Sequence, residues 1–306
     1  PVGLAGTVLG WFVLPPTKDL PADSRFDWTG AFLIAPALTA LAAVLNEGYA
    51  WGASSPMFIG CALLAVILLT LFVRSEQRAP APLIDLTLFR QGAFATGNIA
   101  GLLAYAALFG LFFLLPFVFV RAYHDSAFAA GLRLTIVPVM LGAVAPLGGA
   151  LSDRLGPRLL TVAGMLLCVA ALALLFAVLD GAPTSLPLVM VALAIFGISQ
   201  GLFISPNNSA IVAAAPASLT GEAGGLLNVT RSCGISVGIA AASSLLAWRI
   251  AVLTGSGHNT LHAEAHQLLS AGREVLILLG AFAAAAAAMS LPRGGARSPA
   301  PQGGRT

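Results

Sequence analysis

The 306-residue chain is too apolar for a soluble globular protein, because 58% of its residues are hydrophobic, 9% are charged and its mean hydropathy is +0.93. The pI near 9.1 does not indicate a nucleic-acid partner, because the basic residues are spread over polar segments without clustered aromatics, and anionic lipid accounts for them. The composition predicts an all-α polytopic membrane protein.

The first quarter of the chain holds one short apolar run and two that are long enough to span a bilayer. A span needs about 20 apolar residues, and residues 2–14 are too few. Since Pro1 already lies inside this run, we interpret it as a helix truncated upstream. The next segments are a loop, a second run, a charge-poor turn and a third run: residues 15–27, 28–45, 46–55 and 56–73.

Residues 74–91 form a longer polar connection. Within it, residues 82–90 alternate bulky apolar side chains with single charges. This pattern is typical of a short amphipathic segment at the membrane surface. An irregular loop with a few apolar side chains explains it equally well.

Six further apolar runs follow: residues 93–120, 129–151, 159–178, 186–214, 223–247 and 274–291. A loop is expected at 248–273, where His258, His262 and His266 are spaced four residues apart. That spacing suits metal ligands on one helical face, but a solvated loop is the simpler interpretation. We predict no metal site and no cofactor, and a disordered basic tail at 293–306.

A short glycine-bounded segment, residues 149–158, separates two of these runs. We predict a tight loop in which Gly149 and Gly156 allow close approach or a positive φ, and in which Asp153, Arg154 and Arg158 carry the charge. The segment resembles the signature loop of the major facilitator superfamily, Gly-x-Leu-x-Asp-Arg-x-Gly-x-Arg, and meets every fixed position. The resemblance implies a loop on the cytoplasmic side that helps to close a gate.

With that segment placed inside and the runs alternating, the charges are distributed unevenly. Three basic residues then fall outside, Arg121, Arg249 and Arg273, and Arg133 and Arg231 lie within runs. Ten fall inside: Lys18, Arg25, Arg74, Arg78, Arg90, Arg154, Arg158, Arg293, Arg297 and Arg305. This positive-inside bias predicts a multi-pass plasma-membrane protein with a cytoplasmic C-terminus.

Four further stretches narrow the resemblance: residues 26–30 (Phe-Asp-Trp-Thr-Gly), 82–89, 206–210 and 228–234. Together with two spans before a final six, they are similar to the fourteen-helix drug–proton antiporters of the superfamily (the EmrB/QacA type). The resemblance implies the C-terminal part of a bacterial exporter. Its divisions would be a truncated helix (1–14), two linker helices with a connection (15–92), a six-helix transport half (93–292) and a tail (293–306).

Few polar residues lie inside the runs, and none of the twelve acidic residues lies in the middle of one. A buried amide in lipid needs a partner or water. The candidate cavity-lining residues are Asn98, Gln200, Asn207, Asn208, Asn228 and Arg231. Hydrogen bonding between helices is the simpler explanation for any single amide. Asn207 and Asn208 are the exception, because Pro206 frees the Leu202 carbonyl and can kink the helix beside them. Arg231 either reaches the headgroups or pairs with a carboxylate of the absent half.

Two glycine pairs, Gly197 with Gly201 and Gly234 with Gly238, predict close helix contacts and no more. The resemblance implies export of hydrophobic or cationic compounds against inward proton flow, with the proton-coupling carboxylate in the missing N-terminal half. Uptake of a nutrient or metabolite and a non-transporting scaffold remain alternatives. A membrane enzyme is not indicated, because the sequence shows no carboxylate, histidine or metal cluster at either interface.

Overall fold

The computed structural model describes residues 2–13, 27–52, 55–79, 82–254 and 264–292, and these residues form helices and connecting turns without a strand. Eight helical spans within them are long and apolar enough to cross a membrane. The predicted all-α polytopic class is therefore confirmed. The predicted loop at 15–26 and the tail at 293–306 lie outside the described residues.

The helices are α1 (Val2–Val13), α2 (Trp28–Trp51), α3 (Pro56–Glu76), α4 (Gly92–Arg121), α5 (Ala127–Leu134), α6 (Ile136–Leu155), α7 (Pro157–Val178), α8 (Leu186–Ala214), α9 (Thr220–Thr254) and α10 (Ala265–Ser290). Three short 3₁₀ turns, η1 (Leu86–Arg90), η2 (Pro183–Ser185) and η3 (Ala217–Leu219), lie between them.

Several helices extend beyond the apolar runs that predicted them. The turn expected at 46–55 is wrong over its first half, because α2 continues to Trp51 and ends at Gly52 with φ 80°. The loop expected at 248–273 is wrong at both ends, because α9 reaches Thr254 and α10 starts at Ala265. Hydropathy falls where a helix leaves the hydrocarbon, whereas the helix itself ends only at a cap.

The start of α10 shows such a cap. Glu264 is its N-cap, and the Glu264 N–H donates to Gln267 Oε1 at 3.1 Å in a capping box. His266 therefore lies in the first helical turn, with Nδ1 3.3 Å from Glu264 Oε2. His258 and His262 lie outside the described residues, and within those residues no group of three potential metal ligands is present.

The run predicted at 129–151 is broken into α5 and α6 at Thr135. Pro138 follows one turn later and has no N–H for the Leu134 carbonyl, so the hydrogen-bond ladder is interrupted there. The Thr135 N–H instead bonds the carbonyls of Gly131 and Leu132, both at 3.2 Å. The break was missed because apolar periodicity continues across it.

Residues 82–90 are not an irregular loop throughout, because η1 occupies residues 86–90, and a position at the membrane surface stays a prediction. Asp85 caps η1 by accepting the Thr87 N–H at 2.8 Å, and Leu88 is buried. Leu88 packs with Phe94 at the start of α4, with Ile211 of α8 and with Ala223 and Leu226 of α9. The segment therefore packs against the ends of α4, α8 and α9.

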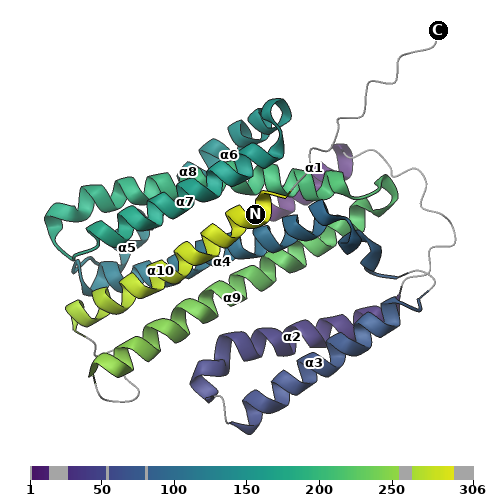
Figure 1. Cartoon of the computed structure of the whole chain (residues 1–306), viewed down its shortest axis with the longest axis horizontal. Coiled ribbons are helices and arrows are strands. Elements are labelled where there is room, and N and C mark those ends of the chain that lie inside the picture. The colour runs from purple at the N-terminus through teal and green to yellow at the C-terminus, as the bar shows by residue number, and fades with distance from the viewer. Residues whose placement is uncertain (1, 14–26, 53–54, 80–81, 255–263, 293–306) are drawn as a thin grey trace.

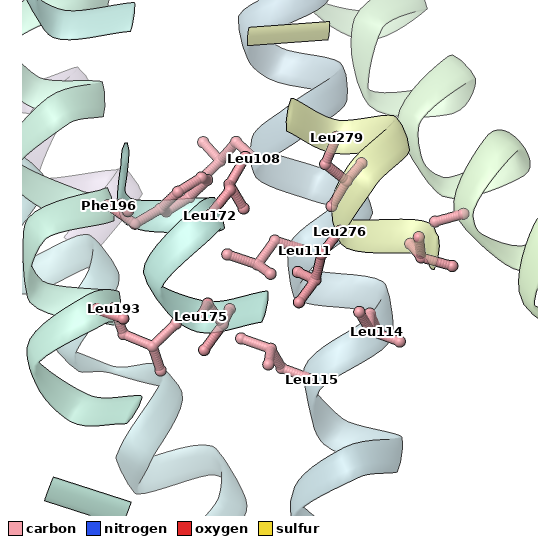
Figure 2. Close-up of a cluster of buried hydrophobic side chains, with 14 of the residues drawn as sticks. Leu108, Leu111, Leu114, Leu115, Leu172, Leu175, Leu193, Phe196, Leu276 and Leu279 are labelled. Atoms are coloured by element: carbon pink, nitrogen blue, oxygen red, sulfur yellow. The ribbon is translucent and has the colours of Figure 1, made fainter. Parts of the chain in front are cut away.

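Helices α4 and α6–α10 form a core bundle, and α2 and α3 form a peripheral hairpin (Figure 1). In the core bundle α8 packs on α6 and α7, α4 packs on α9 and α10, and α10 also packs on α7. The hairpin contacts the bundle through α2 and α9. Figure 2 shows the centre, where leucines of α4, α7 and α10 meet Phe196 and Leu193 of α8.

Glycines set the closest helix contacts, as their spacing predicted. A Cβ at Gly234 would lie 2.5 Å from the Leu102 carbonyl oxygen, and one at Gly238 would lie 2.7 Å from Ala106 Cα, so α9 meets the backbone of α4 directly. Gly197 is packed as closely on Val137 of α6. Membrane helices gain dispersion contacts from such approach, because lipid supplies no hydrophobic driving force between them.

Candidate functional site

The signature segment 149–158 is mostly helix, with a joint of one residue. α6 continues to Leu155, Gly156 takes φ 85° and donates its N–H to Ser152 O at 2.8 Å, and α7 starts at Pro157. The tight connection was predicted correctly, but its length was not. A positive φ is costly for residues other than glycine, so Gly156 is what allows two helices to meet with no loop.

The first end of this segment packs on α8, and the second end is exposed. A Cβ at Gly148 would lie 3.0 Å from the Gly201 carbonyl oxygen, and one at Gly149 would lie 3.2 Å from Ser205 Oγ, so α6 is pressed onto α8 here. Asp153, Arg154 and Arg158 are exposed beyond that contact. Asp153 does not cap α7, which has no side-chain cap. These three residues form no ion pair with any other described residue.

Two of the candidate amides join helices in the core bundle near the same end as the signature segment, which we call the signature end. Asn98 of α4 is 3% exposed, donates to the Phe94 carbonyl at 3.0 Å and accepts from Thr230 Oγ1 of α9 at 3.0 Å. Asn207 of α8 is 1% exposed and donates to the Gly97 carbonyl of α4 at 3.3 Å. The Asn98–Thr230 bond joins α4 to α9, and the Asn207–Gly97 bond joins α8 to α4.

Gln200 is also buried, but its surroundings differ. Its side chain faces α7, where Nε2 lies 3.9 Å from Cys168 Sγ, and its Oε1 has no partner among the described residues. Asn208, next to Asn207 and Pro206 on α8, is half-buried. Pro206 lies inside a helix that continues past it to Ala214.

Asn228 and Arg231 lie on the surface of α9. Asn228 lines a groove of about 230 Å³ between α2 and α9, whose other lining residues are Leu38, Leu41, Ala42, Leu45, Val229, Ser232, Cys233 and Ser236. Arg231 is exposed, and its guanidinium carbon lies 5.5 Å from the centroid of the Tyr105 ring. The six candidates therefore do not line one common cavity among the described residues, and Thr230 and Tyr105 are partners that hydropathy patterns do not reveal.

The opposite end of the bundle carries paired charges. Arg133 of α5, predicted inside a run, forms two bonds to Asp125, Nε to Oδ2 at 2.7 Å and Nη2 to Oδ1 at 3.1 Å. Arg249 of α9 pairs with Glu274 of α10. These pairs join helix ends, in contrast with the exposed charges of the signature segment.

Hydrogen bonds also organise the turn between α7 and α8 at this end. The Ser185 hydroxyl donates to Asp180 Oδ1 at 2.6 Å and the Ala182 N–H donates at 2.8 Å, and together they hold the pKa of Asp180 below its ordinary value. The Ser185 oxygen also lies 2.9 Å from the Tyr123 hydroxyl at the end of α4.

Known proteins match this chain over most of its length. The family model for the Major Facilitator Superfamily matches residues 2–239 and 98–287. The riboflavin transporter RibZ of Clostridioides difficile is 32% identical over 81% of the chain and 52% of its own length. A multidrug resistance protein B homolog of Mycobacterium tuberculosis is 31% identical over 81% of the chain and 46% of its own length.

The tetracenomycin C resistance and export protein of Streptomyces glaucescens is 32% identical over 82% of the chain and 46% of its own length. The chain thus spans about half the length of these relatives. The helical bundle, the signature segment and these matches agree, and the chain belongs to the Major Facilitator Superfamily, whose members are membrane transporters.

Proposed function

We propose that the chain is the C-terminal part of a fourteen-helix antiporter that exports hydrophobic or cationic compounds in exchange for protons. The observation that carries this proposal is the joint at Gly156, which presents Asp153, Arg154 and Arg158 without an ion pair to any described residue, whereas Arg133 pairs with Asp125 and Arg249 with Glu274 at the opposite end. In alternating access, one end must be able to exchange partners as the cavity opens. The printed names of two relatives, for multidrug resistance and for tetracenomycin C export, support export.

The proposal keeps the four divisions of the chain that the sequence resemblance implies. Residues 1–14 and 15–92 would be a helix and two linker helices with their connection, 93–292 the transport half and 293–306 a tail in the cytoplasm of a bacterial cell. The substrate cavity would lie against Asn98, Gln200, Asn207 and Asn208, and the missing N-terminal half of the same protein would complete it. A bilayer, protons and a small substrate are the partners required.

The gate is tested in the full-length gene product by ethidium efflux from loaded cells and from vesicles with an imposed pH gradient. Asp153→Asn and Arg154→Ala should lower the initial rate at least tenfold with unchanged expression, because the gate loses its charges. Arg90→Ala is the matched control, an exposed arginine at the same end that should transport normally. Normal transport by both gate variants would contradict the proposal.

Residues 1–306 alone should not transport. Proteoliposomes that contain only this chain should show no pH-driven ethidium efflux, because the proposal assigns half of the cavity and the coupling carboxylate to the missing N-terminal half. Saturable, gradient-dependent efflux from them would refute the division into halves.

Orientation is tested by labelling, in a version without the native cysteines. Leu155→Cys, at an exposed position of the signature segment, should react with an impermeant maleimide only after the membrane is opened. Glu264→Cys, exposed at the start of α10, should react in intact cells. The reverse pattern would invert the proposed topology.

Arg231 is proposed to pair with a carboxylate of the absent half when the two halves meet. Its exposure on α9 leaves the guanidinium accessible beside Tyr105. In the full-length protein Arg231→Lys should then fail as badly as Arg231→Ala, because an ammonium loses the planar two-pronged geometry. Normal transport by the Lys variant would show that reaching the headgroups is enough.

Uptake of a metabolite is the second candidate, and the relative named as a riboflavin transporter is the observation that favours it. The same vesicle assay separates the two. With the same imposed gradient, radiolabelled riboflavin accumulating where ethidium does not would favour the second candidate.

A further inference from the structure

Two carboxylates meet where the peripheral hairpin starts and ends. Asp27 caps α2, and its Oδ1 accepts the Gly30 N–H at 2.9 Å. Glu76, the last residue of α3, is only 4% exposed, and its Oε2 accepts the Ile84 N–H at 3.2 Å. Each carboxylate therefore uses one oxygen to organise the backbone.

The other two oxygens, Asp27 Oδ2 and Glu76 Oε1, are buried and have no hydrogen-bond partner among the described residues. They face the same small space beside Gly30. A Cβ at Gly30 would lie 2.5 Å from Asp27 Oδ2 and 2.7 Å from Glu76 Oε1, with Leu83 Cδ1 at 2.9 Å. Any side chain at position 30 would collide with these atoms, and the space that Gly30 leaves is lined by the two acceptor oxygens.

The surrounding charges do not satisfy these oxygens. Arg74 of α3 and Arg78, in the turn after it, are exposed and line a cavity of about 580 Å³ together with Asp27. The described residues nevertheless form no ion pair within 4 Å of either carboxylate. From α9, Glu222 adds another negative charge and accepts the Asp85 N–H at 2.9 Å. The Asp85 carboxylate is turned to the Thr87 N–H.

Two ionised carboxylates that face one space, each with a buried oxygen that has no partner among the described residues, repel each other and lack the solvation that water would give them. A single proton removes both costs, because the protonated oxygen becomes a donor to the other. A metal ion fits less well, since the described residues provide no group of three ligands. We propose that Glu76 keeps its proton at neutral pH and that Asp27 Oδ2 is the acceptor it faces in the space beside Gly30.

The site has a consequence for the fold. Glu76 holds Ile84, and its neighbour Asp85 is held by Glu222, so a run of hydrogen bonds leads from the proton to α9. Release of the proton to water restores the repulsion of Glu76 by Asp27 and Glu222, and so destabilises the packing of the hairpin ends against α9. This inference concerns the described residues alone and does not depend on the direction, substrate or proton coupling of transport.

The first measurement is pH-difference infrared spectroscopy of the full chain in lipid nanodiscs, with the carboxyl C=O band of protonated Asp and Glu as the readout. The wild type should retain one such band at about pH 7, well above the pKa of about 4 of free carboxyl groups. Asp27→Asn and Glu76→Gln should each remove it. Glu47→Gln, at an exposed glutamate at the other end of α2, is the matched control and should leave the band in place.

The second measurement is thermal stability against pH, which separates binding from folding. The folded wild type holds a proton that the unfolded chain has released at neutral pH, so its midpoint should fall as pH rises until Glu76 is ionised. Glu76→Gln should remove this part of the slope, because the amide donates to Asp27 Oδ2 at every pH. Gly30→Ala should lower the midpoint and remove the band, since its Cβ occupies the shared space.

Three results would overturn the proposal. The first is the absence of a protonated carboxyl band in the wild type at about pH 7. The second is the same pH slope in the wild type and in Glu76→Gln. The third is stabilisation by millimolar Mg²⁺ or Ca²⁺ that Glu76→Gln abolishes, which would assign the space to a cation.

Discussion

Helices α3 and α4 are almost equally apolar but are used in different ways. Their most apolar stretches have mean hydropathies of 2.6 and 2.4, yet 11% of that stretch is buried in α3 and 61% in α4. Hydropathy measures the transfer of a helix from water into lipid, and that transfer is complete whether the helix then faces lipid or protein. What distinguishes α4 is glycines such as Gly101 and Gly110, beside which α8 and α9 approach closely.

The largest expected effect comes from closing the glycine contact between α4 and α9. Gly238→Leu places a side chain where the Ala106 backbone lies, so we expect a loss of about 3 kcal/mol in the free energy of unfolding, at the upper end of overpacking costs. Gly60→Leu on α3, where a Cβ meets nothing within 4 Å, is the control and should be neutral. Thermal unfolding of the solubilised chain is the measurement. Equal losses would mean that the α4–α9 contact is not specific.

Truncation of a central leucine tests the same comparison by creating a cavity. Leu111 of α4 is 1% exposed in the cluster of Figure 2, and Leu111→Ala should cost about 2 kcal/mol. The value is at the low end because a lipid reference removes most of the water-transfer contribution. Leu64→Ala, at an exposed position of α3, should change the unfolding midpoint little. A cost at Leu64 as large as that at Leu111 would show that the hairpin is buried by something else.

A single hydroxyl gives a smaller contrast. Thr230→Val removes the bond from Thr230 Oγ1 to Asn98 Oδ1 across α9 and α4, and about 1 kcal/mol is the expected cost. Thr70→Val removes a bond to the carbonyl of Val66 in the same helix, which the backbone ladder already uses, so its cost should be close to zero. Both are measured as shifts of the unfolding midpoint. If Thr70→Val is the more costly, interhelical bonding is not what holds these helices.

The turns give the smallest effect, and it depends on pH. In the core bundle, Asp180 has a lowered pKa, so its stabilisation is present above its ordinary value of 3.8 and is lost as pH falls through the folded pKa. Asp180→Asn should therefore lower the midpoint at neutral pH and approach the wild type in acid. In the hairpin, Ser55 caps α3 without charge, and the loss in Ser55→Ala should not vary with pH. A loss for Asp180→Asn that persists in acid would mean that its charge is not involved.

The sequence by itself determined the membrane class, the number and order of the long spans, the signature segment and the close glycine contacts. An apolar run of about 20 residues can satisfy its backbone hydrogen bonds in lipid only as a helix. Two glycines four residues apart lie on the same face of that helix. Helix ends were predicted less well, at Trp51 and Ala265, because the caps Gly52 and Glu264, and not hydropathy, set them. The break at Thr135 was marked by Pro138, a signal that apolar periodicity concealed.

Tertiary structure alone decided which polar groups meet. Asn98, Asn207 and Asn228 each lie inside an apolar run of the sequence. In the structure, Asn98 and Asn207 join core helices, whereas Asn228 faces the hairpin. Asp27 and Glu76 stand 49 positions apart at ordinary helix ends, and only the folding of α2 against α3 brings their oxygens to one space beside Gly30. Partners such as these depend on the rotation and depth of each helix, which follow from packing and not from local pattern.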